Sequence, residues 1–230
     1  MNVVTLMGIF SAFAFFIPAL LILLLRLTVN KSLFALLIYF LITALYNIIG
    51  VGIIKVDVPV EKTFFVISNY LDAPLMLLSF LFFCTDKAKR KKIYLCLGIF
   101  ALYELIITLI YGFGPSTVVY IMGPGIVLIL FFAVYFFVHY VKLTIEKNKG
   151  FGKTFMSTSI VFAYGCYAMI YFFYYFQPSP MDDVFLIYYI ASLVASVLMS
   201  IGLISYHKRH KQFKDVELTR KELRMFFNTP

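Results

Sequence analysis

Ser68-Asn69-Tyr70-Leu71-Asp72-Ala73-Pro74 lies inside the third of seven long apolar segments and places a carboxylate, an amide and a proline at one depth. A transmembrane helix needs about 20 mostly apolar residues. An ionisable side chain within such a segment is costly in lipid and is, by default, a candidate functional group. The stretch therefore predicts a membrane protein with an internal site at Asp72.

The composition of the whole chain agrees with this reading. Of its 230 residues, 63% are hydrophobic and 13% are charged, and the mean hydropathy is +0.95. A soluble domain carries about 25% charged residues, so the solvent of this chain is lipid. We expect an all-α integral membrane bundle of seven transmembrane helices. They are predicted over residues 3–25, 33–54, 63–85, 92–112, 117–142, 153–176 and 184–206.

The loop charges predict the orientation of the bundle. All but two of the 20 Lys and Arg residues fall in the first, third and fifth loops and in the tail. Lys55 and Lys62 alone lie on the other side. By the positive-inside rule, we expect a multi-pass protein of an inner or plasma membrane with its N-terminus outside and its C-terminus inside. Residues 1–25 lack the basic start of a signal peptide and form the first span. The net charge of +9 is thus a topology signal, and we expect no nucleic-acid partner.

The tail differs in kind from the rest of the chain. We divide the protein into a transmembrane domain, residues 1–206, and a basic cytoplasmic tail, residues 207–230. Thr219 to Glu222 fits a capping box that opens a short amphipathic helix. Such a basic helix is typical of a segment lying on membrane lipids. A docking point for a cytoplasmic protein is the alternative.

Polar residues of six helices fall at one level when they are placed by helical rise. Counted from the outer helix ends, five of them lie roughly 10–14 Å deep, and the Gly-Pro-Gly sequence around Pro124 is level with them. This layer predicts a pocket in the outer half of the bundle. Its candidate residues are Asp72, Glu104, Asn69, Tyr70, Asn47, Tyr167, Ser192 and Pro124. The alternative is that these small and polar residues only hold helices together.

Asp72 and Glu104 have no cationic partner from the predicted spans. Lysine occurs in those segments only at their inner ends, at Lys92, Lys142 and Lys153, and the intramembrane histidine, His139, is also near an inner end. Because burial disfavours the charged form of a carboxyl group, each acid either is protonated and hydrogen-bonded or awaits a proton, a metal ion or a cationic ligand. The spacing of Cys and His residues predicts neither a zinc site nor a disulfide framework.

Tyrosines near predicted helix ends are interpreted as anchors at the membrane–water interface. These are Tyr111, Tyr120, Tyr140, Tyr174, Tyr175 and Tyr206.

The architecture resembles that of the microbial rhodopsins. Asn69-Tyr70-Leu71-Asp72 stands where that family has an Arg-Tyr-x-Asp counterion segment, and Pro74 to Leu78 is similar to the Pro-Leu-Leu-Leu that follows. Glu104 takes a place similar to that of the family's acid in the fourth helix. However, the seventh span, residues 184–206, has no lysine, so no retinal Schiff base forms, and the chain has no tryptophan. The resemblance implies a rhodopsin-like scaffold without a covalent cofactor, and a noncovalent lipid or polyene remains open.

Three functions are consistent with these features. The first is a receptor-like or sensory protein that binds a small apolar or amphiphilic ligand in the outer-half pocket. The second is a transporter, or a proton or cation pathway, that uses Asp72 and Glu104. The third is a membrane enzyme acting on lipid or isoprenoid, with the two acids as acid and base. Because the chain lacks a nucleophile motif and a histidine cluster, enzyme chemistry is the least favoured of the three. A structural subunit is the fallback reading, and homo-oligomerisation is left open.

Overall fold

The computed structural model describes residues 3–176 and 181–227, and the side chains of residues 3–176 and 184–212. Within those residues the chain forms seven α helices and one short 3-10 turn, with no strand. Each helix contains a segment long and apolar enough to cross a membrane. The predicted all-α, seven-helix bundle is confirmed, while its orientation stays a prediction. The helices are α1 (Val3–Leu24), α2 (Lys31–Gly50), α3 (Val58–Phe80), α4 (Lys87–Tyr111), α5 (Pro115–Lys147), α6 (Phe151–Tyr175) and α7 (Met181–Phe227).

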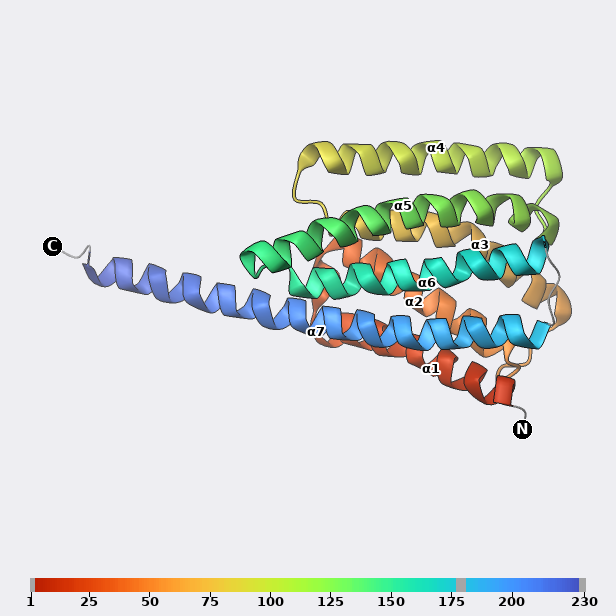
Figure 1. Ribbon diagram of the computed structural model, residues 1–230, viewed down its shortest axis with the longest axis horizontal. Coiled ribbons are helices and arrows are strands. Elements are labelled where there is room, and N and C mark those ends of the chain that lie inside the picture. Colours follow the sequence, from red (N-terminus) through yellow and green to blue (C-terminus); the bar gives the residue numbers. More distant parts are fainter. Residues whose placement is uncertain (1–2, 177–180, 228–230) are drawn as a thin grey trace.

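Six of the helices form a closed ring, and α4 lies outside it (Figure 1). Around the ring the order is α1, α2, α3, α5, α6 and α7, and α7 closes the ring against α1. Among the described helices, α4 packs only against α3 and α5. Consecutive helices are therefore neighbours, as their short connections predict, but the fourth helix does not line the interior of the ring.

The third helix begins and ends five residues earlier than predicted. Asp57 has extended backbone just before the helix, and Pro59 occupies its first turn, a position that tolerates a missing N–H group. At the other end, the chain leaves the helix after Phe80 and forms what we call the α3–α4 turn (residues 81–86), of which the apolar residues 81–84 are buried. Apolar character alone extended the prediction to residue 85.

Side chains of other helices hold the α3–α4 turn by its backbone carbonyl groups. The Lys153 ammonium donates to the Phe82 carbonyl oxygen at 2.9 Å, and the Tyr140 hydroxyl donates to that of Phe83. The Arg90 guanidinium donates to the Cys84 carbonyl oxygen at 3.3 Å. These bonds replace the helical ones that the turn gives up, which is what a buried non-helical segment in a membrane protein requires. Tyr140, predicted to be an interfacial anchor, is instead 2% exposed and bonded inside the bundle.

Two glycines let α6 and α7 approach closely. A Cβ atom added at Gly152 would lie 2.6 Å from the Tyr206 backbone nitrogen and 2.7 Å from the Gly202 backbone oxygen. A Cβ atom added at Gly202 would lie 2.9 Å from the Gly152 backbone oxygen. Small residues at a helix crossing are the usual means of tight packing in membranes, where lipid supplies no hydrophobic drive.

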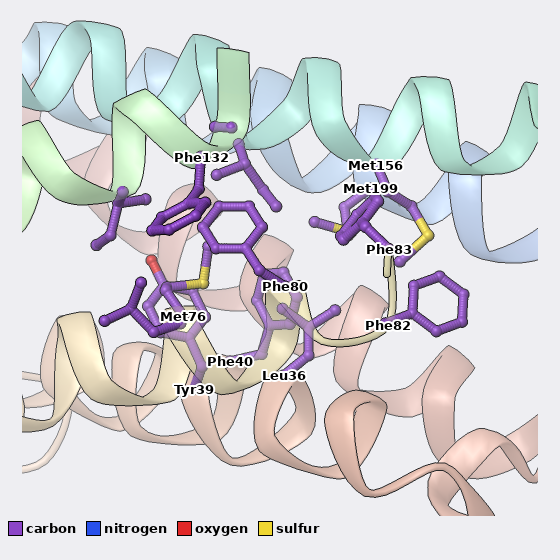
Figure 2. Close-up of a cluster of buried hydrophobic side chains, with 14 of the residues drawn as sticks. Leu36, Tyr39, Phe40, Met76, Phe80, Phe82, Phe83, Phe132, Met156 and Met199 are labelled. Carbon is purple, nitrogen blue, oxygen red and sulfur yellow. The ribbon is translucent and has the colours of Figure 1, made fainter. Parts of the chain in front are cut away.

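A dry aromatic core fills the half of the ring that is farther from the N-terminus. Figure 2 shows Met76 and Phe80 of α3 packed between Phe40 and Phe132. The Phe80 ring stacks on that of Phe136 with centroids 5.7 Å apart. Phe80 and Leu77 have no exposed surface, and Met76 and Phe136 are 2% exposed, so the described core here is tightly packed.

The seventh helix continues far beyond the bundle (Figure 1). It runs without a break from Met181 to Phe227, so no separate short helix begins at Thr219. The side chains that would make its predicted amphipathic face, residues 213–227, lie outside the described ones. The division at residue 206 and the membrane-surface role of the tail therefore remain predictions.

Candidate functional site

A cavity of about 530 Å³ lies inside the six-helix ring, in the half of the bundle nearer the N-terminus. It extends from Tyr39, Asp72 and Tyr164 at its deep end to Gly50, Glu61 and Tyr175 near the helix ends. On α2, α3 and α6 alike this is a span of eleven residues, about 16 Å of helix. The volume is within the range of small-molecule sites.

The same spacing brings α2 and α3 side chains into the cavity. Residues 39, 43, 46, 47 and 50 of α2 line it, and residues 61, 65, 68, 69 and 72 of α3 do so with an identical pattern. Each set follows i, i+4, i+7, i+8 and i+11, which is one face of an α helix. Two adjacent antiparallel helices thus turn matching polar faces toward the same space.

At the deep end, Asp72 is bonded by one tyrosine. The Tyr164 hydroxyl lies 2.9 Å from Oδ1 and 3.0 Å from Oδ2 of Asp72, and donates to the carboxyl group. The Tyr39 hydroxyl is 3.4 Å from that of Tyr164. Asp72, Tyr164 and Tyr39 come from α3, α6 and α2, so three helices meet at this polar cluster. Directly beyond it, Met76 and Leu77 begin the dry core.

Tyrosine is the commonest residue in the walls of the cavity. Nine of the chain's 17 tyrosines line it, contributed by α2, α6 and α7. The Tyr167 hydroxyl is 3.2 Å from the Ser192 hydroxyl, and the Asn47 amide donates to the Tyr188 hydroxyl at 2.9 Å. The Tyr167 ring lies 5.4 Å from the rings of both Tyr164 and Tyr188. These contacts fix the rings as a continuous aromatic wall.

The Gly-Pro-Gly sequence of α5 serves packing around the cavity. A Cβ atom at Gly123 would lie 2.8 Å from the Tyr171 hydroxyl, which donates to the Val119 carbonyl oxygen. A Cβ atom at Gly125 would lie 3.2 Å from the Ala73 Cβ atom of α3. Pro124 itself is on the exposed face of α5, and the helix runs through it without interruption. Although proline removes a backbone hydrogen bond, it does not break this helix, and Pro124, a predicted site residue, does not line the cavity.

Glu104 belongs to a separate place between α4 and the ring. It is 9% exposed, and its Oε1 atom has no hydrogen-bond partner among the described residues. Nearby, the Thr108 hydroxyl bonds the Glu104 backbone oxygen and lies 2.7 Å from the Tyr70 hydroxyl. Glu104 is on α4, outside the ring, and the Tyr70 side chain of α3 reaches toward α4, so neither residue lines the cavity.

The structure thus brings together half of the predicted site residues. Asp72, Asn69, Asn47 and Tyr167 line the cavity. Ser192 is fully buried and supports the wall through Tyr167. Glu104, Tyr70 and Pro124 lie at the same predicted depth but face elsewhere, since depth along a helix does not determine which face a residue occupies.

Sequence reasoning missed most of the tyrosines. Tyr164, Tyr167, Tyr171 and Tyr175 are spaced i, i+3, i+7 and i+11 and therefore share one face of α6. Tyr175, like Tyr174, was predicted to be an interfacial anchor, but both line the cavity. This helical periodicity predicts a tyrosine-lined face of α6, which depth along the helix alone does not.

Comparison with known proteins assigns this chain to no family. No family model, curated protein or solved structure matches the chain. Function must be inferred from the site itself.

The chemistry of the lining is polar, aromatic and acidic. Among the described residues no group of three or more His, Cys, Asp and Glu side chains is placed to hold a metal ion. The lining offers hydroxyl groups, amides, ring faces and two carboxyl groups, at Asp72 and Glu61. This set suits recognition of a small molecule by shape, hydrogen bonding and charge.

Proposed function

We propose that this protein is a ligand-binding membrane protein, receptor-like or sensory, that holds a small amphiphilic molecule in the tyrosine-lined cavity. The observation that carries the proposal is the cavity itself, which has a polar cluster at its deep end and aromatic walls above it. Such a gradient suits a molecule with one polar end and an apolar body. If the N-terminus is outside, as the loop charges predict, the cavity faces the exterior.

The dry core favours binding over conduction. A proton or cation pathway needs polar groups or water on both sides of Asp72. One to two turns beyond Asp72 on α3, Met76, Leu77 and Phe80 are apolar and at most 2% exposed. Glu104, the second group of the proposed relay, lies outside the ring. A site closed at its deep end supports a binding protein.

The experiment is mass analysis and absorbance spectroscopy of protein purified in mild detergent. Wild type is compared with Ile126→Trp, which fills the cavity from α5, and with Val127→Trp on the exposed face of the same helix. We expect a bound molecule in wild type and Val127→Trp, and its loss in Ile126→Trp. A visible absorbance band would show that the bound molecule is a pigment, and a noncovalent polyene is then the candidate. Absence of any bound molecule, or equal amounts in all three proteins, would contradict the proposal.

A further inference from the structure

The charges of the cavity are of one sign. Of the described residues that line it, Asp72 and Glu61 carry carboxyl groups, and none is Lys, Arg or His. Asp72 is at the deep end, and Glu61 is exposed about 16 Å away along α3. Because the entrance and the deep end of the cavity are both acidic, the cavity attracts a cation and repels an anion.

Asp72 has acceptor capacity that the protein does not use. A carboxylate has about four lone-pair sites, whereas the single Tyr164 hydroxyl proton is the only donor that the described residues provide. The remaining acceptor positions of Asp72 adjoin the cavity, because Asp72 lines it. A buried carboxylate in a membrane needs a counter-charge or a proton.

The tyrosine wall offers ring surface in preference to hydroxyl groups. The hydroxyl groups of Tyr164, Tyr167, Tyr171 and Tyr188 are each already bonded within the protein. Tyr164 is buried, but Tyr167, Tyr171 and Tyr188 are partly exposed where they line the cavity, so their rings remain available to a ligand. The faces of aromatic rings attract cations, and cages of such rings are the usual recognition device for organic ammonium groups.

The size and composition of the site separate an organic cation from a metal ion. A metal ion takes several oxygen or nitrogen ligands at short distance, but the deep end supplies one carboxyl group beside two tyrosine hydroxyl groups. A volume of about 530 Å³ accommodates a molecule much larger than an ion.

We therefore propose that the ligand is an organic ammonium cation, with its charged nitrogen beside Asp72 and its body against the tyrosine rings. This inference rests on the proposed ligand-binding function and names the chemical class of its ligand. Glu61 attracts the cation to the entrance, Asp72 neutralises it, and Tyr167 with its neighbouring rings supplies cation–π contacts.

The test compares two probes of nearly the same shape that differ in charge. Choline carries a trimethylammonium group, and 3,3-dimethylbutan-1-ol carries the neutral carbon equivalent. Binding of each to purified protein in lipid nanodiscs is measured by saturation-transfer NMR or calorimetry. We expect choline to bind at least about tenfold more tightly than the alcohol, as a buried charge pair with ring contacts implies.

Substitutions assign the preference to particular groups. Asp72→Asn keeps the shape of the side chain and should remove most of the preference for choline. Tyr167→Phe keeps the ring and should bind choline within about twofold of wild type, whereas Tyr167→Leu should weaken binding by about fivefold. Glu104→Gln, outside the cavity, is the matched acid control and should leave binding unchanged.

The outcomes distinguish the two proposals. If both probes bind equally, if choline does not bind, or if a neutral molecule copurifies in the cavity, the ammonium assignment is overturned while ligand binding stands. If neither probe binds and no molecule copurifies, the ligand-binding function itself fails. Should Asp72→Asn not fold, the comparison of the two probes on wild type and the Tyr167 pair of variants still decide the question.

Discussion

The role of Asp72 depends on the cavity that it lines and on the tyrosine to which it is hydrogen-bonded. In the sequence it is an acid in an apolar segment, and in the structure it ends a cavity with one tyrosine hydroxyl on its two oxygen atoms. That tyrosine, Tyr164, is only 1% exposed and reaches Asp72 from α6. The pair therefore joins two helices at the deep end of the cavity, and removal of either member leaves a buried polar group without its partner.

The Tyr164 hydroxyl should contribute to stability through this bond. We expect Tyr164→Phe to lower the free energy of unfolding by about 1–3 kcal/mol, the usual cost of a buried acceptor left unbonded. Thermal unfolding in nanodiscs measures it, with Tyr120→Phe as the control because the Tyr120 hydroxyl bonds no described residue. Combined with Asp72→Asn, the loss should be less than additive. Strict additivity would show that the two groups do not interact.

At this scale the sequence predicted Asp72, Asn69, Asn47 and Tyr167 because a polar group inside an apolar segment is conspicuous. It did not predict Tyr39, Tyr164 or Tyr188. Tyrosine is common at membrane interfaces and in cores alike, so its role depends on which helix face it occupies and on what packs opposite.

At the scale of the helices, the close approach of α6 and α7 shapes the bundle. The contact at Gly152 is with backbone atoms of Tyr206 and Gly202, which cannot move aside as a side-chain end can. The polar faces of α2 and α3 also shape the site, because side chains with the same spacing on the two helices line the cavity from two sides.

A methyl group at Gly152 should separate these helices. We expect Gly152→Ala to cost about 1–3 kcal/mol, as overpacking does, and to lower the thermal midpoint. Gly165→Ala, on the same helix with no atom near the added carbon, should leave stability unchanged or slightly raised. If both variants melt together, the close crossing makes no contribution.

The α3–α4 turn depends on Lys153. Lys153→Met removes the donor to the Phe82 carbonyl oxygen and to the Tyr140 hydroxyl, so the turn should open and exchange its amide hydrogens faster. Burial raises the pKa of the Cys84 thiol, whereas the Lys153 charge lowers it, and since the thiolate is the reactive form we expect Cys84 to label slowly in wild type. Because loss of that charge would by itself slow labelling, faster labelling in the variant reports opening of the turn. We expect maleimide to label Cys84 faster in Lys153→Met.

This measurement uses a background in which Cys96 and Cys166 are replaced by Ser. Lys142→Met, an exposed lysine near the same end of the bundle, is the control and should label like wild type. Slow labelling in both variants would mean that Lys153 does not hold the turn closed.

Helix existence was predictable, and helix boundaries were less so. Seven apolar segments of sufficient length gave seven helices because lipid forces the backbone to bond internally. The end of α3 was not predictable, since residues 81–84 are as apolar as a helix interior. Only the distant donors Lys153, Tyr140 and Arg90 make a turn there acceptable.

For the whole molecule, the ring of six helices with α4 outside is the feature that determines the site. Short connections predict that consecutive helices are neighbours, yet they do not determine whether a helix lies in the ring or beside it. Direct packing of α3 on α5, with Ala73 against Gly125, excludes α4 from the interior. Its depth along α4 predicted that Glu104 lies in the cavity, but because α4 is outside the ring, Glu104 does not line it.

Cysteine labelling tests the predicted orientation of the whole bundle in the membrane. In a background without native cysteines, a membrane-impermeant maleimide should label Ser116→Cys, in the first turn of α5, in intact cells. Lys149→Cys, in the connection between α5 and α6, should be labelled only after permeabilisation. The reverse pattern would place the basic loops outside, against the positive-inside rule.

An experimental density map of the protein, purified in mild detergent and held in nanodiscs, tests whether a small molecule occupies the cavity. We predict non-protein density inside the six-helix ring, between Asp72 and the Tyr167 ring, with its polar end within hydrogen-bonding distance of the carboxyl group. A cavity filled by tyrosine side chains, with Asp72 enclosed by protein groups alone, would contradict the proposed ligand-binding function.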